Sequence, residues 1–364
     1  MSIERIIISG GGTGGHIFPA IAIADEVKKR NPNAAILFIG AEGKMEMEKV
    51  PAAGYEIKGL KIAGFQRKLT LSNFLLPFKI IGSLMKARSL VKEFKPQVIV
   101  GVGGYASGPA LKAATMMKVP GVLQEQNSFP GKTNKILAKS VSRICVAYDG
   151  LDQFFPKEKI VLTGNPVRSE MVTIDGKKEE GIKHYRLDPS KKTVLIIGGS
   201  LGAKTLNESV TGKLKELADS DVQLIWQCGK LYYPGLKDIE KELPANVKMV
   251  QFIDRMDLAY AAADVVISRA GAISVSELCL IGKPVILVPS PNVAEDHQTK
   301  NAMALVNKDA AVLIKDTEAR GVLIPEVISL LGDSTKCGEL SASIKSLAKP
   351  NATSEIVNTI ESII

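Results

Sequence analysis

The chain alternates between short apolar runs and longer segments in which apolar residues recur every three or four positions. In the first half, the runs that we predict to be strands lie near Arg5–Ser9, Ala35–Ile39, Val98–Gly101, Gly121–Gln124, Arg143–Ala147 and Ile160–Leu162. In the second half they lie near Thr193–Ile197, Gln223–Gln227, Lys248–Gln251, Val265–Ser268, Val285–Pro289 and Ala311–Leu313. Strands that alternate with helices form parallel sheets with right-handed crossovers. The pattern predicts an α/β fold with a doubly wound sheet in each half.

A turn-rich motif, Gly164–Arg168, closes the first series of strands and suggests a domain boundary. A polar stretch follows, and the second half then restarts as the first begins. The apolar run Val194–Ile197 leads into the glycine turn Gly198–Ala203, just as Ile6–Ile8 leads into Ser9–Pro19. Ligands bind at the carboxyl ends of such strands. This weak repeat supports two Rossmann-like domains facing each other across a cleft, and a length of 364 residues agrees with two domains.

The first glycine turn, Ser9–Pro19, joins a strand to a helical segment and contains His16. Glycines allow left-handed backbone angles and close approach to a ligand, and a helix N-terminus attracts anions. The turn also satisfies the dinucleotide-binding pattern G-x-G-x-x-G, with its glycines at Gly10, Gly12 and Gly15. The acid expected about 20 residues later is missing, because that region reads Asn31-Pro32-Asn33. A nicotinamide dehydrogenase is therefore disfavoured.

Polar side chains follow two further strands of the first half. Tyr105 lies in the turn Gly101–Ala110, where it either faces a ligand or packs. Glu125 and Asn127 follow an apolar strand and are candidates for orienting hydroxyl groups. The triplet Gly131-Lys132-Thr133 resembles a P-loop, but a glutamine stands where that motif needs its first glycine. We reject the P-loop interpretation.

Two segments of the second half carry similar signals. Ser274 and Glu277 have the spacing of a capping box, and the alternative is that Glu277 binds the two hydroxyls of a ribose. Asp296–Ala302 follows a strand and suits hydroxyl recognition, unless it is a solvated helix start. The D-x-D sequence Asp219–Asp221 precedes a strand, at the wrong edge for a ligand, and we interpret it as a solvated turn. We expect no metal site.

Composition and charge narrow the choice of partners. The net charge of +9 suits nucleic acid, an anionic membrane or phosphorylated substrates. No interleaved aromatic and arginine pattern is visible, so nucleic acid is disfavoured. The four cysteines are far apart, which predicts reduced thiols and no structural zinc. No signal peptide or apolar run of about 20 residues is visible, so we expect a cytosolic protein that can sit on a membrane surface.

Bulky apolar residues and cations occur together in Asn73–Phe94. The apolar residues cannot all share one helix face, so one stripe can face the core while another stays exposed. Lysines and arginines rim it, which suits an anionic bilayer. We predict membrane contact through Leu75, Phe78 and Ile81, and the alternative is a helix packed on both sides.

Together the motifs resemble those of the MurG-type N-acetylglucosaminyltransferases of peptidoglycan synthesis, over nearly the full chain. The segments that carry the resemblance are Gly11–His16, Gly103–Tyr105, Ser107–Pro109, Glu125–Asn127, Gly164–Arg168, Gly198–Ser200, Ser274–Glu277, Gln298 and Asn301–Ala302. The resemblance implies a GT-B fold whose C-terminal helix returns to the first domain. It implies an acceptor and membrane-side domain of residues 1–164 with about 345–364, and a donor domain of residues 165–344.

The resemblance further implies that N-acetylglucosamine moves from UDP-N-acetylglucosamine to the C4 hydroxyl of undecaprenyl-pyrophosphoryl-muramyl-pentapeptide. The enzyme would be peripheral at the cytoplasmic face of the inner membrane and would need no cofactor. The matching positions imply Ser200 at the diphosphate, Ile253 at the uracil, Arg168 beside the nucleotide, Glu277 at the ribose and Gln298 at the sugar, with Thr13, Gly14, Gly15 and Asn127 completing the site. Leu201 departs from the family, in which many members carry glutamine.

Inversion in one step needs a base for the attacking hydroxyl but no covalent intermediate. An imidazole with a pKa of about 6.5 suits this task, so His16 is our candidate, with Glu125, Asn127 and Tyr105 as further catalytic candidates. Glycine-turn N–H groups can stabilise the leaving diphosphate without a metal. Three rivals are a UDP-N-acetylglucosamine 2-epimerase, a nicotinamide oxidoreductase and a non-catalytic nucleotide-sugar sensor, and we rank the transferase above them.

Overall fold

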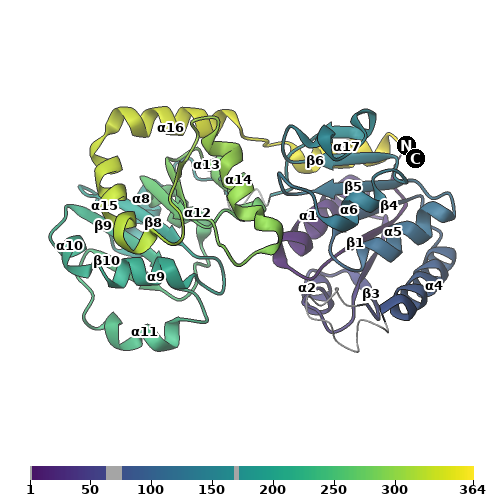
Figure 1. The fold of residues 1–364 in the computed structure, drawn as a ribbon, viewed down its shortest axis with the longest axis horizontal. Coiled ribbons are helices and arrows are strands. Elements are labelled where there is room, and N and C mark those ends of the chain that lie inside the picture. The colour runs from purple at the N-terminus through teal and green to yellow at the C-terminus, as the bar shows by residue number, and fades with distance from the viewer. Residues whose placement is uncertain (1, 63–75, 168–171) are drawn as a thin grey trace. The chain divides into compact units, whose positions relative to one another are not determined.

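The computed structural model describes residues 2–62, 76–167 and 172–364, and its chain divides into two compact units (Figure 1). The first unit is Met1–Val167 with Asn351–Ile364, and the second is Arg168–Pro350. Each unit contains its own parallel sheet with helices around it, so the predicted α/β class with two Rossmann-like units is confirmed.

The described part of the first unit has a seven-stranded parallel sheet, in the order β3-β2-β1-β4-β5-β6-β7. Its strands are β1 (Arg5–Gly10), β2 (Ala35–Ala41), β3 (Glu56–Leu60), β4 (Val98–Gly103), β5 (Gly121–Glu125), β6 (Arg143–Val146) and β7 (Ile160–Leu162). Its helices are α1 (Gly14–Arg30), α2 (Glu46–Ala52), α4 (Leu76–Phe94), α5 (Ser107–Met116), α6 (Lys132–Leu137), the short η1 (Leu151–Gln153) and η2 (Lys157–Lys159), and α17 (Ala352–Glu361).

Alternate residues of β1 pack into two separate hydrophobic cores, one on each face of the sheet, because successive side chains of a strand point to opposite faces. Ile6 and Ile8 pack with residues of α1, α2 and α17, whereas Ile7 packs with residues of α4, α5 and α6. All three isoleucines are fully buried. A sheet covered on both faces explains why its strands read as continuous apolar runs in the sequence.

The second unit has a six-stranded parallel sheet among its described residues, in the order β10-β9-β8-β11-β12-β13. Its strands are β8 (Lys192–Ile197), β9 (Val222–Gln227), β10 (Val247–Val250), β11 (Val265–Ser268), β12 (Val285–Leu287) and β13 (Val312–Leu313). Its helices are α8 (Lys178–Tyr185), α9 (Lys204–Thr211), α10 (Leu214–Ala218), α11 (Tyr233–Glu240), α12 (Met256–Ala262), α13 (Ala272–Ile281), η3 (Ala294–Asp296), α14 (His297–Val306), α15 (Ala319–Gly332) and α16 (Ser334–Ser346).

The chain leaves the second unit between α16 and α17. Leu340 of α16 belongs to the core of the second unit, and Ile356 and Ile360 of α17 belong to a core of the first. Arg30, at the end of α1, holds α17 in place: its guanidinium donates to Asn358 Oδ1 at 2.7 Å and to Glu361 Oε2 at 2.9 Å. The second unit ends at Pro350, a few residues after the position of about 345 at which the resemblance places the return to the first domain.

One strand, β3, was not predicted. Glu56 and Lys58 form a surface ion pair of 2.8 Å, and Gly59 replaces a side chain that could pack. An edge strand with polar residues carries no apolar run, so it looks like a loop in the sequence. The other strands lie where the apolar runs place them, to within one or two residues at most ends.

Helix α4 buries one side and exposes the other. Ala87 and Val91 are completely buried, whereas Ile80, Ile81 and Met85 are exposed by 45%, 56% and 69%. Within the described residues the alternative of a helix packed on both sides is therefore wrong. Leu75 lies outside the described residues, and so does the side chain of Phe78. Across the described chain, no helix combines the length and the apolar character needed to cross a bilayer.

Candidate active site

Each sheet has one place where its winding direction reverses, between β1 and β4 in the first unit and between β8 and β11 in the second. Ligands of open parallel sheets bind beside such switch points, outside the carboxyl ends of the strands. The glycine turns after β1, β4 and β8 and the segment after β11 all stand at these two points. They define one candidate site in each unit.

In the first unit, the glycine turns after β1 and β4 touch each other through their backbones. Gly11 N donates to Gly103 O at 3.3 Å. Gly104 has a φ of 89°, and a Cβ added to it would lie 2.3 Å from the carbonyl oxygen of Gly11. Only glycine fits there, so the sequence pattern of paired glycine turns has a steric cause.

His16 lies in the first turn of α1, and its ring is held through Nδ1 by residues of the first glycine turn. Its Nδ1 is 3.0 Å from Gly11 O and 3.2 Å from Thr13 Oγ1. A carbonyl oxygen can only accept, so Nδ1 carries the hydrogen and Nε2 carries the lone pair. The ring packs on Gly103, where an added Cβ would lie 2.8 Å from Nε2. This tautomer is the one that a general base needs.

The N-terminus of α1 adds an anion-attracting group to the same site. Thr13 is its N-cap residue and has extended backbone angles, and the first turn, which includes Gly14 and Gly15, holds no acidic residue. The unpaired N–H groups and the partial positive charge of the helix end can therefore act on an oxygen or a phosphate placed here. Tyr105, predicted either to face a ligand or to pack, is 50% exposed after β4.

Glu46, which the sequence analysis did not single out, lies directly beneath the first glycine turn. It is 1% exposed, although it is the first residue of α2. Its Oε2 accepts from Gly12 N at 2.8 Å, and its Oε1 accepts from Ala41 N at 3.0 Å. A glutamate in a polar segment looks solvated in sequence, so the pattern held no signal for it.

Glu125 orders its own loop. It is 2% exposed. Its Oε1 accepts from Asn127 N at 3.0 Å, while its Oε2 accepts from Asn134 Nδ2 at 2.8 Å and from Gly131 N at 3.1 Å. Burial raises the pKa of Glu125, and these hydrogen bonds act in the opposite direction. The carboxylate is thus committed to the loop, which favours a positioning role for Glu125 over the predicted catalytic one.

In the second unit, the glycine turn after β8 leans on the loop after β9. Lys230 N donates to Ser200 O at 3.2 Å, and Leu231 N donates to Leu201 O at 3.2 Å. Gly202 has a φ of 88°, and a Cβ on it would lie 2.0 Å from Cys228 O. Ser200 and Leu201 are exposed above this support. The turn is therefore supported on one side by this loop, and residues 200 and 201 are exposed at the switch point.

The capping-box alternative for Glu277 is wrong. Helix α13 begins at Ala272 with Gly271 as its N-cap, so Glu277 lies in the second turn of the helix. Its Oε2 accepts a hydrogen bond from the hydroxyl of Tyr260 at 3.3 Å. Tyr260 is fully buried, and burial together with the Glu277 carboxylate raises its pKa. The tyrosine thus fixes a half-buried carboxylate at the carboxyl edge of the sheet.

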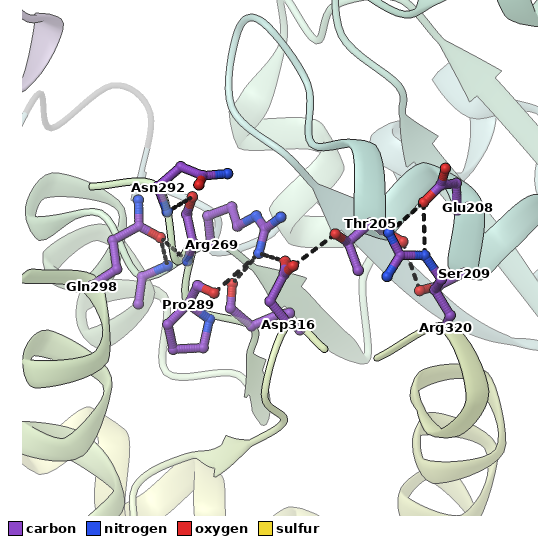
Figure 2. A network of polar contacts seen from close by, with 12 residues as sticks. Thr205, Glu208, Ser209, Arg269, Pro289, Asn292, Gln298, Asp316 and Arg320 are labelled. Atoms are coloured by element: carbon purple, nitrogen blue, oxygen red, sulfur yellow. Dashed lines mark hydrogen bonds and ion pairs between the residues drawn. The ribbon is translucent and has the colours of Figure 1, made fainter. Parts of the chain in front are cut away.

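Gln298 and Arg269 tie together the segments that follow β11 and β12 (Figure 2). Gln298 Oε1 accepts from Ala270 N at 3.2 Å and from Ser290 N at 2.8 Å. Arg269 Nη1 donates to the carbonyl oxygens of Val288 and Pro289 and pairs with Asp316. The sequence predicts a role for Gln298 but holds no signal for Arg269 and its carboxylate partner Asp316.

The other positions singled out in the sequence lie away from these two networks or outside the described residues. The side chain of Ile253 is buried after β10, and Arg168 lies outside the described residues. Asp219–Asp221 stands between α10 and β9, at the amino edge of the sheet, as the solvated-turn interpretation requires. In the ranges that the structure describes, no cluster of His, Cys, Asp and Glu has the geometry to hold a metal ion.

Two Rossmann-like units with glycine turns at both switch points form a GT-B-like fold. The chain belongs to glycosyltransferase family 28: residues 6–146 match the model of the N-terminal domain, and residues 193–356 match that of the C-terminal domain. The resemblance seen in the sequence is thereby confirmed at the level of the family.

Relatives and one solved structure agree with the family. The chain is 56% identical to the UDP-N-acetylglucosamine–N-acetylmuramyl-(pentapeptide) pyrophosphoryl-undecaprenol N-acetylglucosamine transferase of Flavobacterium psychrophilum, over 99% of this chain and 98% of that one. It is also 56% identical to the transferase of the same name from Parabacteroides distasonis, with the same coverage. The crystal structure of Acinetobacter baumannii MurG superimposes with a TM-score of 0.81 at 28% identity, covering 99% of both chains.

Proposed function

We infer that this protein transfers N-acetylglucosamine from UDP-N-acetylglucosamine to the muramyl sugar of an undecaprenyl-pyrophosphoryl-linked muramyl-pentapeptide. The observation that carries this inference is 56% identity over 99% of the chain to a transferase named for that reaction. The reaction completes the lipid-linked disaccharide that peptidoglycan synthesis uses. An α-linked donor attacked once from the opposite side gives a β-linked product.

In our proposal, the second unit binds the donor. Its glycine turn after β8, with Ser200 at the tip, supplies N–H groups to the diphosphate. Glu277 accepts hydrogen bonds from the ribose hydroxyls, since its carboxylate is held in place by Tyr260. Gln298 already uses its oxygen for two backbone N–H groups, so its amide N–H₂ is the group that can donate to the sugar. Ile253 and Arg168 would contact the uracil and the nucleotide.

The first unit activates the acceptor. His16 Nε2 takes the proton from the C4 hydroxyl as the oxygen bonds to the anomeric carbon and the bond to the diphosphate breaks. The proton ends on the imidazole and the electron pair leaves with UDP, so no covalent intermediate forms. Thr13, Gly14, Gly15 and Asn127 would orient the sugar and the acceptor. Helix N-termini stabilise the developing negative charge without a metal.

The exposed side of α4 is a candidate membrane contact. Ile80, Ile81 and Met85 form an apolar group, and the exposed cations Arg88 and Lys92 lie further along the same helix. Apolar insertion combined with attraction to anionic headgroups is how peripheral proteins bind bilayers. A lipid-linked acceptor would require such contact, so we propose peripheral attachment at the cytoplasmic face of the cell membrane.

An assay with labelled UDP-N-acetylglucosamine and a lipid-linked muramyl-peptide tests the function, with and without a chelator. We expect disaccharide-lipid in both conditions. Absence of product would overturn the transferase, and an epimerase would instead convert the donor with no acceptor present. Loss of product only with chelator would show that the transfer needs a metal ion.

The His16→Ala variant should bind UDP normally and lose about 10²- to 10⁴-fold in transfer rate. The control is His184→Ala, because His184 is exposed on α8, and this variant should keep the native rate.

Membrane attachment has its own test, with vesicles that contain phosphatidylglycerol. The double variant Ile81→Ser and Met85→Ser should reduce binding, because both side chains are exposed. The matched control is Ile136→Ser, since Ile136 on α6 is 79% exposed and lies outside α4. Equal binding by all three proteins would remove α4 from the proposal. Added salt should weaken the binding of the native protein.

A further inference from the structure

The peptide group between Gly11 and Gly12 is hydrogen-bonded to a side chain at each end. Its N–H, from Gly12, donates to Glu46 Oε2 at 2.8 Å, and its carbonyl, from Gly11, accepts from His16 Nδ1 at 3.0 Å. One planar amide therefore stands between a carboxylate and an imidazole. Hydrogen bonds that share a group in this way polarise one another in the same direction.

The carboxylate is built into this position. Both oxygens of Glu46 accept backbone N–H groups, one from Gly12 and one from Ala41, which is the bonding pattern of an ionised carboxylate. A Cβ added to Gly11 would lie 2.2 Å from the carboxyl carbon of Glu46. Gly12 has a φ of 84°, where glycine is favoured. The two glycines of the turn thus allow the carboxylate to lie directly against the peptide.

We propose that Glu46 is a positioning residue for His16 and acts through the Gly11–Gly12 peptide. The carboxylate draws on the amide N–H, which increases the negative charge on the carbonyl oxygen. That oxygen then holds the hydrogen on Nδ1, keeps the lone pair on Nε2, and stabilises the imidazolium when Nε2 accepts a proton. A carboxylate bonded directly to a histidine does the same in nucleophile–histidine–carboxylate triads. This inference rests on the proposed role of His16 as base.

Nitrogen NMR of ¹⁵N-histidine-labelled full-length protein tests the inference without any assay of transfer. The chain has three histidines, so His16→Gln assigns the signals. In the native protein, we expect neutral His16 to carry its hydrogen on Nδ1. In Glu46→Gln, the fraction with hydrogen on Nε2 should rise. A native His16 with hydrogen mainly on Nε2 would overturn the proposal, even if the variant does not fold.

Kinetics provide the second readout. Glu46→Gln should lower kcat by about 10- to 100-fold, a range typical of residues that orient a functional group from behind, with a small change in the KM of the donor. Glu46→Asp keeps the charge and should recover part of the rate. Glu48→Gln, exposed on the same helix, is the control and should act like the native protein. Unchanged kcat in a folded Glu46→Gln would refute the relay. If His16→Ala alone keeps full activity, the proposed base fails, while the tautomer result stands.

Discussion

Arg269 and Asp316 form an ion pair of 2.5 Å in which the side chains are only 13% and 15% exposed. Asp316 also accepts from Thr205 Oγ1 at 2.8 Å, at the start of α9 (Figure 2). The pair therefore links the segment after β11 to α9, the helix that follows the glycine turn of the second unit. Three segments at the carboxyl edge of the sheet are held by one carboxylate.

Removing the charge of Asp316 should lower the stability of the second unit. Breaking a largely buried ion pair costs about 3–5 kcal/mol, so Asp316→Asn should lower the free energy of unfolding by an amount of that order. Thr205→Val removes one hydroxyl bond and should cost about 1 kcal/mol. Urea unfolding measures both.

A neighbouring pair supplies the control for this prediction. Arg320 and Glu208 form an ion pair of 2.7 Å with side chains that are 50% and 39% exposed. Arg320→Gln should cost about 0–1 kcal/mol, because surface pairs contribute little. Similar losses for Asp316→Asn and Arg320→Gln would contradict the distinction between the two pairs.

Glu277 offers a prediction about the donor. If its carboxylate accepts the ribose hydroxyls, Glu277→Gln should weaken UDP binding by about 1.5–3 kcal/mol, the range for hydrogen bonds to a charged group. Isothermal titration calorimetry with UDP measures this, and Tyr260→Phe should have a smaller effect in the same direction. Glu216→Gln, on α10 at the amino edge, should bind UDP normally. An unchanged affinity in Glu277→Gln would remove the ribose role.

Asp257 makes the stability of the folded protein depend on pH in the acid range. Hydrogen bonds from Arg255 at 2.9 Å and from Lys177 at 2.7 Å hold the pKa of Asp257 well below its usual range. A carboxyl group whose pKa is lower in the folded state adds stability above its unfolded pKa, about 3.9. That contribution is lost as the pH falls from about 5 through the acid range.

Asp257→Asn should therefore be less stable than the native protein at pH 7, by about 1–3 kcal/mol. The side chain of Arg255 is 48% exposed, so solvent screening favours the lower end of that range. The difference in free energy of unfolding should shrink as the pH is lowered below about 4. Asp254→Asn, an exposed neighbour, should show no such trend. A gap that stays constant with pH would contradict the assignment.

Arg30 predicts how firmly α17 is attached. Its guanidinium bonds Asn358, Glu361 and Ser354, and its side chain is 24% exposed. Arg30→Gln should increase hydrogen exchange in residues 352–361 before exchange rises elsewhere, because local opening becomes easier. Lys29→Gln, in which the native side chain is 82% exposed, is the control. Equal exchange in both variants would show that apolar packing alone holds the helix.

Much of the fold could be predicted because strands that are buried on both faces of a sheet appear in the sequence as continuous apolar runs. Glycine turns behind those strands also marked both switch points, since the close backbone contacts at Gly104 and Gly202 exclude any Cβ. Strand β3 could not be found, because an edge strand with Glu56 and Lys58 lacks the run.

The supporting side chains of the site were harder to see. Glu46 stands in a polar segment, and its burial arises only when α2 is placed beneath the first glycine turn. Asp316 lies far along the chain from Thr205 and Arg269, and only the order of the strands brings the three together. The sequence also allowed a capping box for Glu277, which requires Ser274 as the N-cap of α13. The helix begins at Ala272 instead, a few residues earlier. Local patterns do not record such long-range contacts.

The course of the chain also constrains the order of its synthesis. Residues 168–350 are inserted between two parts of one unit, because Ile356, Val357 and Ile360 of α17 complete a core that begins with Ile3 and Ile6. During translation the inserted unit emerges whole and is free to fold first. The core beneath the helix that carries His16 stays partly open to solvent until residues 352–361 leave the ribosome. This core is thus completed only after the proposed donor-binding unit has been made.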